Sequence, residues 1–209
     1  MQLFLRHNHG VMAALWLAAS FLVGCGGTTV TPTFPTSSGL LRPDRVLVYD
    51  FAVTPDELDL NASGATGSLT QSQEDIRVGR ELARALASSL VSELRSRDIE
   101  AYPASDAAPP GENTASVKGR FLRTNPRDGS TVAGFALGSG QVRTQLQIYQ
   151  GTGIRLRLVA EGQTSTPSNL KSGLGNDAMR AAIEAEAKRT ATQVADRFAD
   201  YYKRQGWIK

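Results

Sequence analysis

Residues 45–53 read Arg45-Val-Leu-Val-Tyr-Asp-Phe-Ala-Val53, a nearly continuous apolar run. Such a run is typical of a central strand that is buried on both faces of a sheet. Residues 54–70 contain a proline, an asparagine and two glycines, so a long polar loop should follow the strand. We therefore expect residues 45–53 at the centre of the fold.

A long amphipathic helix is predicted after this loop, at about 73–97. Valine and leucine recur there at helical spacing, while arginine and glutamate lie off the apolar stripe. Two capping arrangements fit its start, either Ser72 with Asp75 or Thr70 with Gln73. A short strand at 99–102 should follow and close a βαβ-like unit.

Three further segments alternate apolar and polar residues, which predicts strands with one covered and one wetter face: 117–122, 142–149 and 154–159. The last two flank Gly151-Thr152-Gly153, a suitable hairpin connection. In the final strand, Ile154, Leu156 and Leu158 are assigned to the covered face.

A second amphipathic helix is predicted at about 176–204, with Asn176 or Asp177 as its cap. The elements together predict an α/β (α+β) sandwich. It consists of one mixed, mostly antiparallel sheet of about five strands, with two amphipathic helices packed on one face.

The N-terminal residues predict export. A basic start containing Arg6 precedes a short apolar run, which is typical of a signal peptide over 1–24. The run ends in Leu22-Val23-Gly24-Cys25, and Cys25 is the only cysteine of the chain. This tetrapeptide resembles the bacterial lipobox, which implies cleavage between Gly24 and Cys25 and lipid attachment to the Cys25 thiol. The alternative is an ordinary secretory signal followed by an incidental cysteine.

The expected mature chain has two parts. Residues 25–44 are rich in Thr, Ser, Pro and Gly and should form a lipidated flexible tether. Residues 45–205 should form one domain. In a Gram-negative host, Gly26 in place of the aspartate associated with inner-membrane retention favours the outer membrane, facing the periplasm.

Composition excludes several kinds of chemistry. The formal net charge is only +3, which argues against a nucleic-acid partner. Both histidines, His7 and His9, leave with the signal, so the mature chain can form neither a Ser-His-Asp triad nor a His-ligated zinc site. The Asp56-Glu57-Leu-Asp59 segment fits no calcium loop and is expected to be a solvated acidic loop. No catalytic residue, metal site or cofactor is predicted.

One candidate interaction surface remains. Basic residues recur at the outward phase of the three predicted strands and could form a patch for an anionic partner, such as lipid, polysaccharide or an acidic protein: Lys118, Arg120, Arg143, Arg155 and Arg157. The alternative is an ordinary solvated sheet face. The Gly134–Gly140 segment lacks the lysine and the following helix of a phosphate loop, so we expect a tight turn or bulge there.

Three segments suggest a family: Arg45–Phe51, Lys118-Gly-Arg-Phe-Leu122 and Gly134-Phe-Ala-Leu-Gly-Ser-Gly-Gln-Val-Arg143. Together they resemble the bacterial lipoproteins grouped as domain of unknown function 4410, over roughly residues 43–205. The resemblance implies a lipobox protein with no assigned activity, and hence no catalytic residues. The strand–helix order is also similar to envelope interaction modules of the TolB N-terminal and curli-secretion lipoprotein type.

Two functional hypotheses follow. The first is a membrane-anchored, non-enzymatic envelope domain that acts through protein or surface contacts. The alternative is a periplasmic hydrolase that uses carboxylates only, because some glycosidases need no more than two carboxyl groups.

Overall fold

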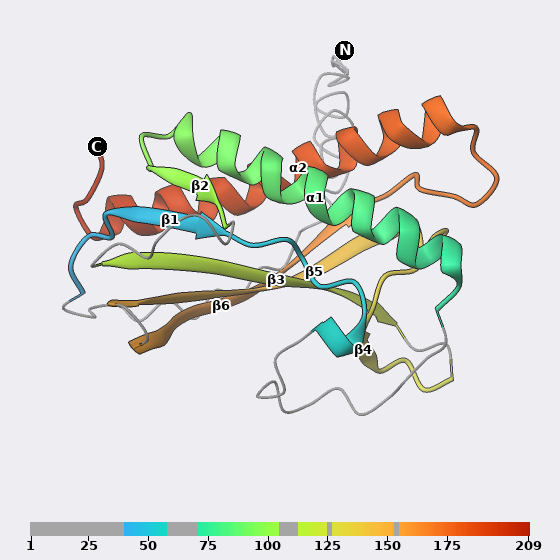
Figure 1. The fold of residues 1–209 in the computed structure, drawn as a ribbon, viewed down its shortest axis with the longest axis horizontal. Coiled ribbons are helices and arrows are strands. Elements are labelled where there is room, and N and C mark those ends of the chain that lie inside the picture. Colours follow the sequence, from blue (N-terminus) through green and yellow to red (C-terminus); the bar gives the residue numbers. More distant parts are fainter. Residues whose placement is uncertain (1–39, 58–70, 105–112, 125–126, 153–154) are drawn as a thin grey trace, which may run out of the picture.

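A computed structural model describes residues 40–57, 71–104, 113–124, 127–152 and 155–209. These residues form one six-stranded sheet and two long helices (Figure 1). In chain order the elements are β1 (Arg45–Val48), a short 3-10 helix (Pro55–Glu57), α1 (Gln73–Arg95), β2 (Ala101–Pro103), β3 (Thr114–Thr124), β4 (Thr131–Ala133), β5 (Gln141–Thr152), β6 (Arg155–Pro167) and α2 (Asn176–Arg204).

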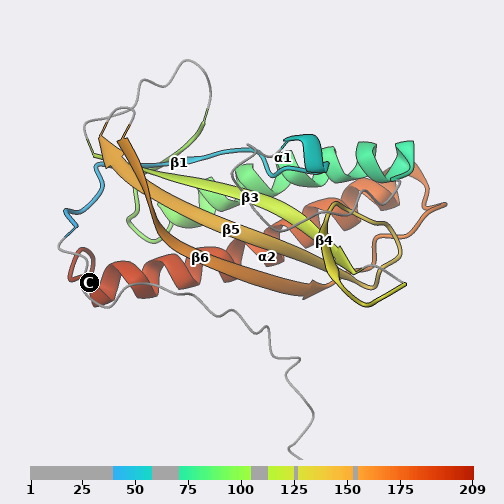
Figure 2. The ribbon, with the colours of Figure 1, turned by 90° about the horizontal axis from the view of Figure 1, so that it is seen from below.

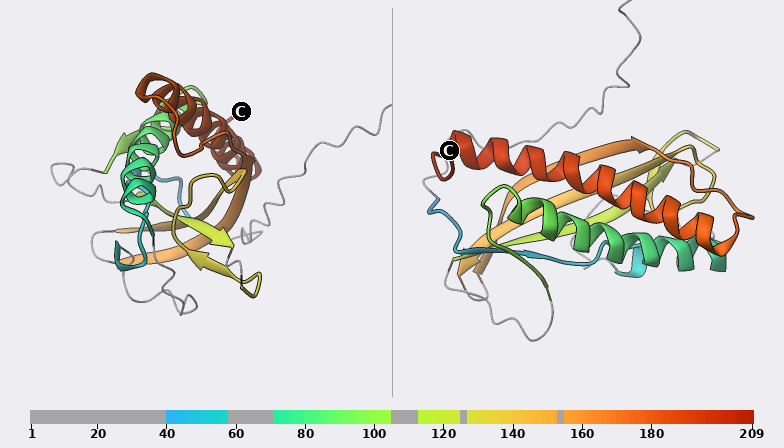
Figure 3. Two further views of the ribbon diagram at one scale, coloured as in Figure 1. Left: turned by 90° about the vertical axis from the view of Figure 1, so that its right-hand side faces the viewer. Right: turned by 90° about the horizontal axis from the view of Figure 1, so that it is seen from above.

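The sheet is mixed, as predicted. Its strand order is β2-β1-β3-β5-β6, and β4 pairs with one end of β3. β1 is parallel to β2 and β3, whereas the remaining pairs are antiparallel. Both long helices cover the same face of the sheet, and within the described residues neither of them covers the opposite face, which we call the open face (Figures 1 and 3). The predicted α+β sandwich is confirmed, with β4 as an additional short strand.

β1 is shorter than predicted. It ends at Val48, although Phe51 and Val53 remain buried and Ala52 still forms a parallel bridge with Arg120. The βαβ unit of β1, α1 and β2 is present. The two described helices are not long and apolar enough to cross a membrane.

The two helices start differently. Ser72 caps α1 in a capping box with Asp75, which confirms one of the two predicted arrangements. α2 instead has Gly175 as its cap residue, with no side-chain hydrogen bond, so the prediction of Asn176 or Asp177 is wrong by a residue or two. Glycine is accepted at this position without a side-chain contact.

A β-bulge interrupts the pairing of β5 with β6. Ile148 pairs with Ala160, but the next residue, Tyr149, pairs with Leu158. Val159 is therefore the additional residue of the bulge. One additional residue reverses which face the following side chains occupy.

The bulge overturns the predicted phase of β6. Leu156 pairs with Gly151 and Leu158 pairs with Tyr149, and directly opposed residues share a face. Leu156 and Leu158 therefore lie on the open face, and each is 43% exposed. The prediction that Leu156 and Leu158 belong to the covered face is wrong, and Ile154, which was assigned to the same face, lies outside the described residues.

Each of the three segments that suggested the family contributes one phenylalanine to a shared cluster in the core. The Phe121 ring lies 6.1 Å from the Phe51 ring and 5.4 Å from the Phe135 ring, and all three are buried. Gly119 leaves the space that Phe51 fills, since a Cβ atom there would lie 2.3 Å from that ring. These contacts join β3 to the chain that follows β1 and to the turn that follows β4.

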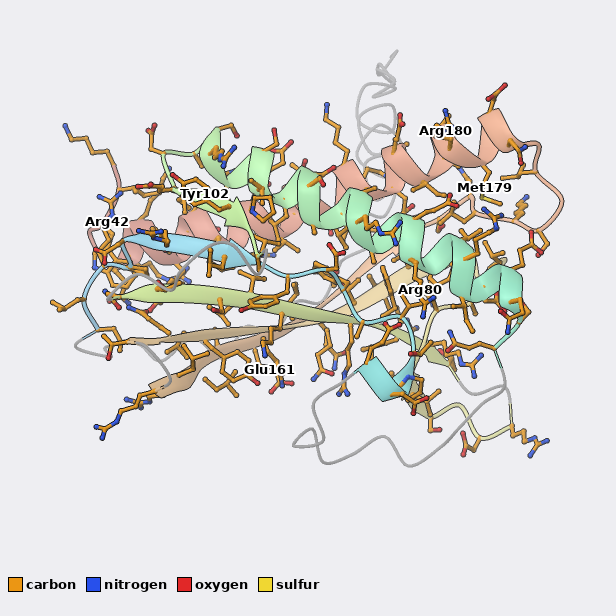
Figure 4. All side chains as sticks on the ribbon, viewed as in Figure 1. Arg42, Arg80, Tyr102, Glu161, Met179 and Arg180 are labelled. Atoms are coloured by element: carbon orange, nitrogen blue, oxygen red, sulfur yellow. The ribbon has the colours of Figure 1, made fainter. Side chains whose placement is uncertain are left out.

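The molecule has two distinct ends. The start of the described chain, the end of β5, the start of β6 and the C-terminus lie together at one end (Figures 2 and 3). β4 and the N-termini of both helices lie at the other. Figure 4 labels Arg42 and Tyr102 near the first end, and Met179 and Arg180 near the second.

Candidate functional site on the open face of the sheet

Lys118 lies on the open face between two aromatic rings. Its Nζ is 5.3 Å from the centre of the Tyr49 ring and 5.8 Å from that of Tyr149. Tyr149 Oη donates a hydrogen bond of 3.0 Å to Gln147 Oε1. Cation–π contacts hold the ammonium group close to the sheet. Tyr49 was not among the predicted site residues, because it had been placed inside a longer buried strand.

Arg120 belongs to a row of polar side chains that crosses three strands. Arg120 Nε donates to Gln145 Oε1 at 2.5 Å, and Gln145 Nε2 donates to the Glu161 carboxylate. Glu161 lies on the side of the sheet away from the helices (Figure 4). The guanidinium group is therefore oriented by the Gln145 side-chain amide, which in turn donates to a carboxylate on β6. It is not a freely solvated cation.

Arg143 lies nearer the β4 end of the same face. Its Nη1 donates to Thr124 Oγ1 at 3.0 Å, and the residue pairs with Leu122 across the ladder. Lys118, Arg120 and Arg143 therefore share the open face, as the alternation of β3 and β5 predicted.

Arg155 and Arg157 are separated from these three residues. Arg157 pairs with the buried Gln150, and Arg155 pairs with Thr152, on the face opposite to that of Lys118. The single five-residue patch is therefore corrected to two groups. The physical reason is the bulge at Val159, which exchanges the faces of the arginines and leucines in the first part of β6.

The Gly134–Gly140 segment is a structural turn, as expected. Gly134, Gly138 and Gly140 have φ values of 137°, 71° and 72°, a region that favours glycine. The turn is held at the start of α1, because the Leu137 amide donates to Asp75 Oδ1 at 2.8 Å and Gln71, just before the helix cap, donates through Nε2 to the carbonyl oxygen of Phe135 at 2.9 Å. The segment therefore positions Phe135 in the core.

Two carboxylates near this turn hold the backbone. Burial raises the pKa of the Asp75 carboxyl, but hydrogen bonds from the Leu137 amide and from Ser72 outweigh it, so the net pKa is lowered. The same balance lowers the pKa of Glu57, where the opposing bonds come from the Val53 and Thr54 amides and from Arg80. Lowered values suit anions that accept hydrogen bonds and do not suit a general acid at neutral pH.

The acidic loop has no described metal site. Asp56 and Glu57 lie in the short 3-10 helix, whereas Asp59 lies outside the described residues. Glu57 is occupied by an ion pair with Arg80 of 3.2 Å. Within the described ranges, no group of three or more His, Cys, Asp or Glu side chains could hold a metal ion.

A buried carboxylate in α2 was not predicted. Glu186 has a side chain only 1% exposed and accepts hydrogen bonds from Thr166 of β6 and, at 2.6 Å, from Arg189 Nη2. Thr190 lies beside it, with its Oγ1 3.1 Å from that of Thr166. Buried carboxylates need such partners. The position of Glu186 beside Ile183 and Ala187 on the apolar stripe was the available signal.

The predicted lipidation and cleavage residues, Cys25 and Gly24, lie outside the described residues. The described chain begins at Leu40, within the predicted tether of 25–44.

Comparisons with known proteins place the chain in a family. The dodecameric PelC of Paraburkholderia phytofirmans is 13% identical, and the match covers 81% of this chain and 98% of that one, with a TM-score of 0.37. A Xanthomonas campestris protein of the DUF330 family model is 14% identical over 83% and 91% of the two chains, with a TM-score of 0.42. The search of curated proteins found no match to the sequence. The family model for the domain of unknown function DUF4410 matches residues 46–165, more than half of the chain. The resemblance drawn from the sequence is therefore confirmed, and the protein belongs to the DUF4410 family.

Proposed function

We propose that this protein is a lipid-anchored domain of the bacterial cell envelope that acts through binding and not through catalysis. The observation that supports the anchor is the sequence Leu22-Val23-Gly24-Cys25, in which the only cysteine directly follows a short apolar run. Cleavage before Cys25 would leave a thiol that carries a diacylglyceryl group and an acylated N-terminus. Several acyl chains anchor a protein almost permanently.

A binding role is supported by the chemistry of the mature chain. It has no histidine, and its only cysteine would be occupied by lipid. Asp75 and Glu57, with their lowered pKa values, accept hydrogen bonds from backbone amides. No described feature favours the alternative of a hydrolase that uses only carboxylates.

The open face is the proposed binding surface. It presents Lys118 between two tyrosines, and Arg120 and Arg143 further along the sheet. Glutamine and glutamate side chains of β5 and β6 lie between these cations. Such a surface suits a partner with spaced negative charges and hydrogen-bonding groups.

The anchor is tested by Cys25→Ser in the native host. We expect loss of labelled palmitate from the protein and its release from the membrane fraction, because serine supplies no thiol for the lipid. Thr28→Ser is the matched control, since it leaves the tetrapeptide intact and should behave as wild type. If wild type takes up no palmitate while Cys25→Ser still sediments with membranes, the anchor is wrong.

The outer membrane is the proposed location. In a Gram-negative host, Gly26→Asp should retain the protein in the inner membrane, which fractionation on a density gradient would detect. An unchanged distribution of Gly26→Asp, with wild type already in the inner-membrane fraction, would contradict an outer-membrane location.

A further inference from the structure

The β5–β6 end of the domain combines exposed apolar and basic side chains. Leu41 is 77% exposed, and Leu156 and Leu158 are the exposed leucines of the open face. The arginines of β6 alternate with these leucines and point to the other face. We name these side chains the hairpin-end patch: Leu41, Arg42, Arg155, Leu156, Arg157 and Leu158.

The arginines of the patch are available for an anionic surface. Within the described residues, no acidic side chain forms an ion pair with Arg42, Arg155 or Arg157. Four other arginines do form such ion pairs within the described residues, as Arg97 does with Glu93 and Asp196 at 2.6 and 2.7 Å. The patch therefore presents cations on one side of a strand and leucines on the other.

The start of the domain is fastened beside this patch. The carbonyl oxygen of Leu41 accepts hydrogen bonds from Gln150 Nε2 at 2.7 Å and from Asn113 Nδ2 at 3.3 Å. Gln150 is the residue of β5 that pairs with Arg157. The predicted tether consequently enters the domain at the patch and not at the opposite end of the sheet.

The tether length brings the patch to the bilayer. About 15 residues separate Cys25 from Leu40, and a polypeptide of that length can reach no further than about 50 Å in any conformation. The end of the domain that contains the patch is therefore the end nearest to the anchored lipid.

We propose that the hairpin-end patch docks on an anionic phospholipid surface, with the leucines at the headgroup boundary and the arginines on the lipid phosphates. This inference rests on the proposed Cys25 anchor. Arginine favours phosphate through bidentate hydrogen bonds, and its apolar stem extends along the interface. A stable protein partner would need roughly 20–30 residues on each side, many more than the patch provides. Docking would hold the domain in one orientation, with the β4 end turned away from the membrane.

The docking is tested with single-cysteine probes in the lipidated full chain. Cys25 is consumed by the lipid, so Leu156→Cys introduces the only free thiol for a polarity-sensitive fluorophore. The protein is reconstituted into vesicles of phosphatidylethanolamine and phosphatidylglycerol that contain a lipid-borne quencher. Gln163→Cys is the matched control, because Gln163 is exposed on the same strand and the same face but near the other end of β6.

We expect the probe at position 156 to be quenched at least twofold and the probe at position 163 to be unaffected. Arg155→Glu with Arg157→Glu should reverse the quenching. Each basic residue near an anionic surface strengthens adsorption about fivefold, so losing two should reduce the ratio of docked to undocked protein at least about 25-fold, and the two introduced carboxylates should reduce it further by repulsion. Replacing phosphatidylglycerol by the zwitterionic phosphatidylcholine should also reduce the quenching at position 156.

Equal quenching at positions 156 and 163, or none at either, in a chain that carries lipid would overturn the docking and leave the anchor intact. Crosslinking of position 156 between copies in place of quenching would also overturn it, and would assign the patch to self-association. If the chain carries no lipid and does not associate with the vesicles, both the proposed anchor and the proposed docking are wrong.

Discussion

Asp75 connects the start of α1 to the Gly134–Gly140 turn. Its Oδ2 accepts hydrogen bonds from the Ser72 amide and hydroxyl at 3.1 and 2.7 Å, and its Oδ1 accepts one from the Leu137 amide at 2.8 Å. One carboxylate therefore completes a capping box and also holds a loop 62 residues further along the chain. Sequence pattern could predict only the local half of this role.

Asp75→Asn should destabilise the protein by about 1–2 kcal/mol at pH 7, because the amide cannot accept all three bonds and lacks the charge. The lowered pKa of Asp75 means that its contribution is complete above the unfolded pKa of about 3.9 and disappears as pH falls through the folded value. The difference in free energy of unfolding between the two proteins should therefore shrink below pH 4. Urea denaturation at pH 7 and pH 3 measures it, and a constant difference would contradict the ionised role.

Packing of the core requires glycine at position 119, where the Phe51 ring leaves no room for a side chain. A Cβ atom there would meet the buried Phe51 ring at 2.3 Å, so Gly119→Ala should cost about 1–3 kcal/mol through overpacking. Phe51→Leu alone should also destabilise by leaving a small cavity. The double variant should be less unstable than the sum of the two, because leucine makes room for the methyl group. If thermal unfolding shows that the two losses of stability simply add, the methyl group at position 119 is not in steric conflict with the Phe51 ring.

At the scale of an element, α1 is held by its apolar stripe. Leu86 is fully buried and Arg84, two residues earlier, is exposed. Leu86→Asp should cost several kcal/mol and abolish cooperative unfolding, because it places an unpaired charge against the sheet. Arg84→Ala is the matched change on the opposite side and should alter the free energy of unfolding by less than about 0.5 kcal/mol. Similar melting temperatures for Leu86→Asp and wild type would refute the helix phase.

Helices and alternating strands could be predicted because their signals are local and periodic. The 3.6-residue stripe located both helices closely, and the Ser72–Asp75 spacing identified one cap. The cap at Gly175 could not be found in this way, because it uses no side chain. β1 was predicted too long because Phe51 and Val53 are buried, against Phe121 of β3 and beside Gly79 of α1, while only an isolated bridge at Ala52 continues the pairing.

The candidate site was predicted only where strand alternation is unbroken. β3 and β5 keep a strict two-residue period, so Lys118, Arg120 and Arg143 were placed on the correct face. In β6, a bulge at Val159 exchanges the faces, and no proline or glycine at that position marks it. Long-range pairs such as Leu137 with Asp75 have no periodic signal at all.

At the scale of the whole molecule, the two basic groups face different surroundings. Lys118, Arg120 and Arg143 lie on the broad open face, among amides, tyrosines and Glu161. The second group, the two arginines of β6, belongs to the end of the domain where the predicted tether enters. A domain anchored and docked at that end would leave its open face accessible to an envelope partner.

This separation predicts different outcomes for two doubly reversed proteins with the same change in formal charge. Lys118→Glu with Arg143→Glu should abolish capture of an acidic partner by crosslinking in living cells, because two of the three cations of the open face are reversed and the third, Arg120, is already bonded to Gln145. Arg155→Glu with Arg157→Glu should leave that capture intact and should reduce docking on anionic vesicles. Mass spectrometry of the crosslinked products, compared with wild type, measures the first effect.

Two controls make this comparison decisive. All four side chains lie at or near the surface, so both variants should melt within a few degrees of wild type. Electrostatic capture should also weaken as added salt shortens the Debye length below about 8 Å. If the Lys118 and Arg143 variant folds and still crosslinks to the same proteins as wild type, the open face is only a solvated surface. The partner must then bind the helical face or the β4 end, because the docked end would be occupied by the membrane.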